Sequence, residues 1–357
     1  MSKITPITPN QNCIRGTIKL HPKLTRLPFD LMGPIVKGKG STLLSVDLTT
    51  SLISRDAGKT WGARPLYDYK PTENEYKISR ERVLLRTKEG SLILSFMNYN
   101  ERRWLWDDKL GALPGTRVPQ YVMRSTDDGK TWEPATLLHE DWTGDIRNII
   151  QLKSGRLVLS SMRMFLNPTR HTVLTYISDD DGVTWKPSNI IDLGGCGHHD
   201  GATEASVIEL NDGRLWFLIR TNLDYFWQAY SHDAGETWTE LGPTQIDTSS
   251  SPGLLTRLQS GRIMLVWNRL KKQKGGKVKH RGGDNIWSTR KASWQREEIS
   301  VAFSEDDGKT WSDSVVIATN KDSQVCYPRA LEYKPGEIWL TTMFGNLRAK
   351  FFEKDFI

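Results

Sequence analysis

The chain has 357 residues but few cysteines and no long apolar run, and both absences restrict what the protein can be. Its cysteines, Cys13, Cys196 and Cys326, are too few to form the disulfide framework of a small secreted domain. No apolar stretch approaches the length of a membrane-spanning helix. The first residues, MSKITPITPNQN, lack the basic and apolar regions of a secretory signal. We therefore expect a cytoplasmic protein with no membrane partner.

The composition is that of an ordinary soluble globular protein, with 25% charged and 37% hydrophobic residues. The formal net charge of +7 favours an anionic partner, which is either a nucleic acid or an acidic glycan. A length of 357 residues allows one large domain, and the 14 tryptophans are many for this length.

An octapeptide with the pattern S-x-D-x-G-x-T-W recurs along the chain, and its residue types are those of a tight turn. The aspartate can bind backbone amides within the turn, the glycine supplies a positive φ, and the tryptophan can pack the turn onto a sheet. The copies are SRDAGKTW at Ser54–Trp61, STDDGKTW at Ser125–Trp132, SDDDGVTW at Ser178–Trp185, SHDAGETW at Ser231–Trp238 and SEDDGKTW at Ser304–Trp311. We interpret them as structural turns without a catalytic role.

Hairpins precede these turns and complete a repeating unit of four strands. Segments such as IIQLKSGRLVLSS and SVIELNDGRLWFLI are two apolar strands around a glycine turn. The turns fall at Gly40, Gly90, Gly155, Gly213, Gly261 and Gly336. Six units of four antiparallel strands predict an all-β, six-bladed β-propeller formed by residues 1–357 as a single domain. The sixth unit lacks the octapeptide, so we expect the N-terminal segment Ile14–Leu20 to supply its outer strand and close the ring.

The octapeptide resembles the Asp-box, or BNR repeat, of sialidases, and the resemblance covers nearly the whole chain. Repeats of this kind are specific for the propeller fold and much less specific for an activity. Strand direction puts both kinds of turn on one face of the propeller. The opposite face carries the long loops Asn98–Gln120 and Arg269–Arg296, which we expect to bind the ligand.

Polar residues at strand ends and in loops on that face could share one central pocket. They are Asp47, Arg147, Arg163, His198, His199, Asp200, Glu204, Arg220, Arg296 and Tyr327. Arginines that converge with a glutamate and a tyrosine are costly to bury without a ligand, so the group as a whole favours a binding site over unrelated surface charges.

Three segments resemble sialidase segments that carry active-site residues. EASVIELNDGRLWFLIR resembles the segment with the catalytic glutamate and an arginine of the carboxylate-binding triad, which implies Glu204 and Arg220. SWQREEISVAFS implies Arg296 as a further arginine, and VCYPRALEY implies Tyr327 as the nucleophile. A tyrosine avoids the charge repulsion that a carboxylate nucleophile would meet at an anomeric carbon bearing a carboxylate. Arginines can hold that carboxylate with paired hydrogen bonds.

The chain departs from the sialidase pattern in blade 1. The family's Arg-Ile-Pro motif corresponds here to LMGPIVKGKGSTLL, which has no arginine at that position. Arg26, Arg147 or Arg163 then has to compensate, unless the substrate is not an ordinary sialoside. The loop that carries the family's catalytic aspartate is short, which leaves Asp47 as the candidate acid, with Asp107 or Asp108 as substitutes. His199 and Asp200 are further candidates for substrate binding.

The resemblance implies an exo-acting glycoside hydrolase that removes a terminal acidic sugar, with no cofactor. One alternative is a glycosidase or lyase of the same fold that acts on a uronic or ketodeoxy sugar, and another is a glycan-binding propeller without activity. The basic run Lys271–Arg281 is accompanied by no nucleic-acid motif, so we expect no nucleic-acid partner. His198 and His199 are adjacent and would point to opposite faces of a strand, so we expect no metal site.

Overall fold

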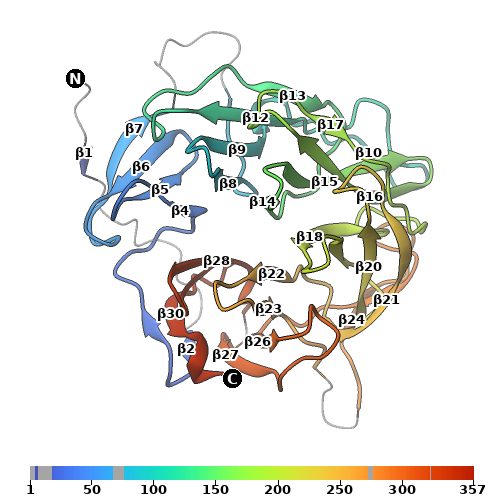
Figure 1. Ribbon diagram of the computed structural model, residues 1–357. Helices are drawn as coiled ribbons and strands as arrows, with labels where there is room; N and C mark the ends of the chain where they lie inside the picture. The colour runs from blue at the N-terminus through green and yellow to red at the C-terminus, as the bar shows by residue number, and fades with distance from the viewer. Residues whose placement is uncertain (1–4, 7–17, 67–75, 272–275, 322) are drawn as a thin grey trace.

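The computed structural model describes residues 5–6, 18–66, 76–271, 276–321 and 323–357, and these residues form a ring of short antiparallel strands around a central axis (Figure 1). Helical structure in this part of the chain is confined to two 3₁₀ turns, Tyr99–Glu101 and Glu353–Asp355. Among the same residues, no helix is long and apolar enough to span a lipid bilayer.

Six blades surround the axis, each with four antiparallel strands, as the repeats predict. Blade 1 contains β4 (Ile35–Lys37), β5 (Leu43–Val46), β6 (Thr50–Ser54) and β7 (Gly62–Pro65). Blade 2 contains β8 (Val83–Arg86), β9 (Leu92–Met97), β12 (Gln120–Ser125) and β13 (Thr136–His139). Blade 3 contains β14 (Ile149–Gln151), β15 (Leu157–Leu166), β16 (Thr169–Ser178) and β17 (Lys186–Pro187).

The second half of the ring repeats this order. Blade 4 contains β18 (Thr203–Glu209), β19 (Leu215–Arg220), β20 (Tyr225–Ser231) and β21 (Thr239–Asp247). Blade 5 contains β22 (Leu254–Arg257), β23 (Ile263–Trp267), β26 (Glu298–Ser304) and β27 (Val315–Thr319). Blade 6 contains β28 (Cys326–Lys334), β29 (Glu337–Phe344), β30 (Arg348–Phe352) and β3 (Thr25–Arg26).

The ring closes through an N-terminal strand, but not through the predicted one. The fourth strand of blade 6 is β3, in which Thr25 pairs with Lys350 and Arg26 with Ala349. Within the predicted segment, β2 (Lys19–Leu20) instead extends blade 5 by pairing with β27, and residues 14–17 lie outside the described part of the chain. The outer edge of β27 is free to accept β2, and β3 then reaches β30 a few residues later. A further strand, β1 (Thr5–Pro6), pairs with β7 of blade 1.

The octapeptides form tight turns held by their own polar groups. In the blade 3 copy, Asp180 accepts hydrogen bonds from the hydroxyl of Ser178 (2.8 Å) and from the backbone N–H of Thr184 (2.9 Å). The Ser178 hydroxyl accepts from the N–H of Gly182 at 2.9 Å, and Trp185 donates to the Gly182 carbonyl at 3.0 Å. Gly182 has a φ of +87°, which a residue with a Cβ rarely adopts.

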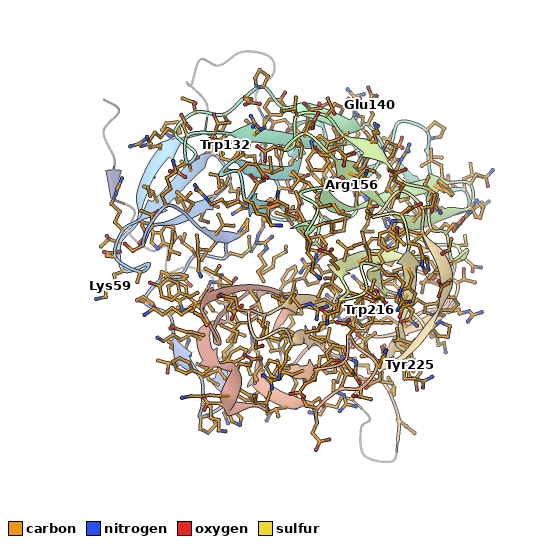
Figure 2. All side chains as sticks on the ribbon, viewed as in Figure 1. Lys59, Trp132, Glu140, Arg156, Trp216 and Tyr225 are labelled. Carbon is orange, nitrogen blue, oxygen red and sulfur yellow. The ribbon has the colours of Figure 1, made fainter. Side chains whose placement is uncertain are left out.

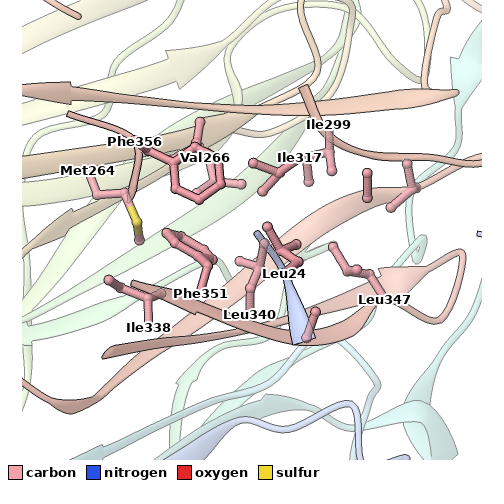
Figure 3. Packing of buried hydrophobic residues seen from close by; sticks show 14 of the residues in the cluster. Leu24, Met264, Val266, Ile299, Ile317, Ile338, Leu340, Leu347, Phe351 and Phe356 are labelled. Atoms are coloured by element: carbon pink, nitrogen blue, oxygen red, sulfur yellow. The ribbon is translucent and has the colours of Figure 1, made fainter. Parts of the chain in front are cut away.

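Aliphatic and aromatic side chains pack between neighbouring blades and hold the ring together. Figure 3 shows one such cluster, in which Met264 and Val266 of blade 5 face Ile338 and Leu340 of blade 6, with Leu24 beside them. All five of these side chains are buried. Figure 2 shows side chains filling the space among the strands, with Lys59 on the rim.

Hairpin turns and octapeptide turns share one face of the propeller, as strand direction predicts. Asn211 in the blade 4 hairpin turn donates its N–H to Asp307 of the blade 5 octapeptide at 2.9 Å. The first strands therefore begin on the opposite face, close to the axis. That face also carries two small hairpins within the long loops: β10 (Trp106–Asp107) with β11 (Gly111–Ala112), and β24 (His280–Gly282) with β25 (Lys291–Ser293).

Candidate active site

Tyr327 and Glu204 meet at the centre of this face. Both residues lie at the start of a first strand, in β28 and β18, and the Tyr327 hydroxyl donates to Glu204 Oε1 at 2.8 Å. Each has a positive φ, 62° for Tyr327 and 41° for Glu204. A residue with a side chain adopts this conformation at a cost of roughly 1–3 kcal/mol, and such strain is concentrated at functional sites.

Arg220, at the end of β19, fixes the charge state of this pair. Its Nη1 donates to Glu204 Oε2 and, at 3.1 Å, to the Tyr327 hydroxyl. Burial alone would raise the pKa of Glu204, but the charge and hydrogen bond of Arg220, helped by Arg147 and Arg296, hold that pKa below its ordinary value. Burial and the Glu204 charge raise the pKa of Tyr327. The resting site therefore contains a neutral phenol that donates to an ionised carboxylate.

Arg147 and Arg296 flank Tyr327. The centres of their guanidinium groups lie 5.1 Å and 5.4 Å from the centroid of the tyrosine ring. Arg147 donates to the Pro328 carbonyl at 3.0 Å, and Arg296 donates to the Ser250 carbonyl at 2.5 Å. Both side chains are buried, so two positive charges lie beside the phenol in the interior of the site.

Several buried polar atoms of this site have no hydrogen-bond partner among the described residues. They are Arg147 Nε and Nη1, Arg296 Nε, Asp145 Oδ2 and His171 Nδ1. Most buried polar groups in native proteins are hydrogen-bonded, so unused donors concentrated in one place call for an explanation such as a ligand. The free donors on Arg147 and Arg296 are suited to an anion.

Asp145 and Arg82 belong to this part of the molecule, although no sequence pattern singled them out. Asp145 lies with its Oδ2 3.7 Å from Arg147 Nη1, and burial raises its pKa well above the ordinary value even though Arg147 opposes the shift. Arg82 precedes β8 and donates to the carbonyls of Val46 (2.7 Å) and Gly33 (3.1 Å). Arg82 could have been found as the polar residue directly before a first strand, whereas Asp145 lies four positions before β14 and follows no such rule.

Three other predicted site residues, Asp47, Arg26 and Arg163, have contacts outside the Tyr327–Glu204 pair. Asp47 is held by Arg82 at 3.2 Å. Arg26 lies in β3, the outermost strand of its blade, where it is exposed and donates to the Ile18 carbonyl at 3.4 Å. Arg163 forms an ion pair with Asp141. None of these three residues is brought to the Tyr327–Glu204 pair by a contact of the described residues.

A cavity of about 470 Å³ opens beside the pair. Glu204 and Arg220 contribute to its wall, together with His199, Asp108 and aromatic side chains of the blade 2 loop. Burial lowers the pKa of His199 to about 2, so its ring is uncharged at neutral pH. Asp200 instead holds the loop together, because its Oδ2 accepts from the N–H groups of Cys196 and Thr289, both at 3.0 Å.

Asp107 and Asp108, the substitute candidates for the acid, have different surroundings. Asp107 accepts from the N–H groups of Lys109 (2.8 Å) and Leu110 (2.9 Å) and so stabilises its own turn, whereas Asp108 lines the cavity. Within the described ranges, no three His, Cys, Asp or Glu side chains are grouped so as to hold a metal ion.

Comparison with known proteins gives the family. The profile of the BNR repeat-like domain matches residues 45–340, which is most of the chain. The protein belongs to the sialidase/BNR superfamily. Relatives include a sialidase of Clostridium perfringens, 25% identical over 210 residues (53% of this chain and 52% of the relative). A sialidase of Bacteroides fragilis is 26% identical over 243 residues (59% of this chain and 43% of the relative).

The matched region thus spans about half the length of these BNR-family relatives. Among solved structures, the Hadza microbial sialidase Hz136 superposes with a TM-score of 0.62 at 16% identity, over 91% of this chain and 66% of that one. The two structures therefore share the propeller fold over nearly the whole of this chain.

Proposed function

We propose that the protein is an exo-acting glycoside hydrolase of the sialidase type, which removes a terminal acidic sugar with Tyr327 as nucleophile. The observation that carries the proposal is the Tyr327–Glu204 hydrogen bond of 2.8 Å, set between two arginines with unused donors. Sialidase relatives at 25% and 26% identity support the same chemistry.

The proposed first step transfers the phenolic proton of Tyr327 to Glu204 as the tyrosine oxygen bonds to the anomeric carbon. The bond from that carbon to the leaving-group oxygen breaks, and this oxygen takes a proton from an acid. We assign the acid to Asp108, because Asp108 lines the cavity whereas Asp47 is held by Arg82. Water then releases the sugar by the reverse proton transfers.

The substrate carboxylate is proposed to lie against Arg147 and Arg296. The family's Arg-Ile-Pro motif corresponds here to LMGPIVKGKGSTLL, which has no arginine at that position. Arg147 lies beside Tyr327, and its Nε has no hydrogen-bond partner among the described residues, so it can donate to the carboxylate in place of the missing arginine. The missing arginine also favours a second candidate, a glycosidase of this fold that acts on a different acidic sugar.

A panel of aryl glycosides tests the proposal. Because a tyrosine nucleophile suits an anomeric carbon that carries a carboxylate, we expect the aryl group to be released fastest from a sialoside. Faster cleavage of the ketodeoxy-sugar glycoside or of the uronide would favour the second candidate. Cleavage of none of them, with retained binding of an acidic sugar, would identify a glycan-binding propeller.

A further inference from the structure

The small hairpin in the blade 5 loop carries positive charge that the proposed mechanism does not use. We call it the basic hairpin, residues 276–293, and it contains β24 and β25. Its lysines and arginines are all exposed, and they are Lys277, Lys279, Arg281, Arg290 and Lys291. The ion pairs formed near it by described residues are Lys271–Glu298 and His280–Asp224, and neither includes any of these five cations.

Asp284 is the single acidic residue in the sequence of the basic hairpin, and its carboxylate is committed to a turn. It accepts from the N–H groups of Trp287 (2.8 Å) and Ile286 (3.1 Å), and these hydrogen bonds keep its pKa below the ordinary value. The five cations therefore exceed the acidic charge of the hairpin. Clustered like charges repel one another, and an anion placed among them relieves that repulsion.

The basic hairpin is fixed against the wall of the cavity. Its residue Ile286 lines the cavity beside Glu204 and Arg220. The carbonyls of Ile286 and Trp287 accept from the N–H groups of His198 (3.1 Å) and His199 (3.0 Å), in the loop that leads into blade 4. An anion that binds here meets a backbone that is already ordered, which lowers the cost of binding.

Trp294 connects the basic hairpin to the arginine beside Tyr327. The centre of the Arg296 guanidinium lies 3.6 Å from the centroid of the Trp294 ring, and that of Arg281 lies 5.1 Å from the same ring. Arg296 is buried, Trp294 is half-buried and Arg281 is exposed. Positive charge therefore continues from the interior of the site to the solvent past a single indole ring.

We propose that the basic hairpin binds a second acidic group of the substrate, so that the enzyme acts on glycans with at least two neighbouring acidic sugars. The inference rests on the proposed function, in which Arg147 and Arg296 hold the carboxylate of the terminal sugar. Lys279 and Arg281 then receive the charge of the next acidic sugar. The continuity with Arg296 favours an acidic glycan over a nucleic acid, because the first acidic group lies in the sugar pocket.

Calorimetric titration of the Tyr327→Phe variant, which should not turn the ligands over, compares methyl sialoside with the methyl glycoside of a sialic acid dimer. Two additional ion pairs at the surface should make the dimer bind about fivefold to tenfold more tightly at low salt. Because exposed charges are screened, the preference should vanish at high ionic strength. Replacing Lys279 and Arg281 together by alanine should remove the preference and leave the affinity for methyl sialoside within about twofold.

The matched control replaces Lys130 and Lys309 by alanine, which removes the same charge from octapeptide turns on the opposite face. Both lysines are exposed, so the control should keep the preference for the dimer. Melting temperatures establish that every variant is folded.

The affinity for methyl sialoside tests the proposed function, and the ratio of the two affinities tests the second acidic site. Equal binding of the two ligands by the parent overturns the second site and leaves the proposed function standing, as does a preference that survives the loss of Lys279 and Arg281. An oligothymidylate that binds more tightly than the dimer and needs the same two cations would assign the hairpin to nucleic acid instead. Failure to bind either sugar contradicts the proposed function for sialosides, and the second site falls with it.

Discussion

At the scale of single residues, the site is defined by how many hydrogen-bond donors remain unused. Arg220 is fully engaged by Glu204, Tyr327 and Ser250. Arg147, by contrast, donates to the Pro328 carbonyl and pairs with Asp145 at 3.7 Å, and its buried Nε has no hydrogen-bond partner among the described residues. A buried cation with free donors is costly unless a ligand satisfies them, so Arg147 is the residue most directly tied to an anionic substrate.

Replacing Arg147 by lysine tests this role. Lysine keeps the positive charge but loses the planar set of donors that matches a carboxylate. A hydrogen bond to a charged group contributes roughly 1.5–3 kcal/mol, so we expect KM for the cleaved aryl glycoside to rise about tenfold to a hundredfold. Arg163→Lys, in the same blade but paired with Asp141, is the control and should leave KM within about twofold. Equal KM values in the two variants would remove Arg147 from the carboxylate site.

Tyr327 and Glu204 could be predicted from the sequence because of their position in the repeat. Tyr327 and Glu204 each stand nine positions before a hairpin glycine (327 to 336 and 204 to 213), so the repeat itself brings them to the same level. Asp145 and Arg82 follow no motif, and their roles depend on burial and on contacts with other blades. Arg26, in TRLPFD, was a candidate because its segment resembles the family motif, although it comes several residues too early, and its strand is the outermost in blade 6.

At the scale of elements, the octapeptide turns were predictable because each one is held by residues within eight positions. Asp180 receives bonds from Ser178, Val183 and Thr184, all from the same copy. The closing strand was not predictable to the residue, because β2 and β3 are two residues long and give no period in the sequence. In the folded ring, β2 pairs with the edge of β27 and β3 pairs with the edge of β30.

Removing one turn aspartate should lower stability without affecting the site. Asp180→Ala deletes a charged acceptor that serves backbone and hydroxyl donors, so we expect the free energy of unfolding to fall by about 1.5–3 kcal/mol. Asp179→Ala, at the adjacent position, breaks an ion pair with Arg156 in which Asp179 is 57% exposed, and surface pairs of this kind are worth about 0–1 kcal/mol. Urea unfolding followed by tryptophan fluorescence measures both. Similar losses in the two variants would contradict the structural role given to Asp180.

At the scale of the whole molecule, the propeller works as a frame that brings distant parts of the chain together at one end of its axis. Glu204 and Tyr327 are 123 positions apart in sequence and share a hydrogen bond. The opposite end contains the turns that stabilise each blade, so the site face can vary in its loops without loss of the fold. The small hairpins β10–β11 and β24–β25, in the long loops of blades 2 and 5, lie on this face.

The most direct test of the account is the rate at which Tyr327→Phe cleaves the best aryl glycoside of the panel. The substitution removes one hydroxyl and keeps the ring that packs edge to face on Phe344 at 5.2 Å, so the variant should fold like the parent. Tyr333→Phe, in the same strand and stacked on Trp339 at 4.2 Å, is the control. We predict that turnover is abolished in Tyr327→Phe and unchanged in Tyr333→Phe. Full activity of a folded Tyr327→Phe variant would contradict the tyrosine mechanism.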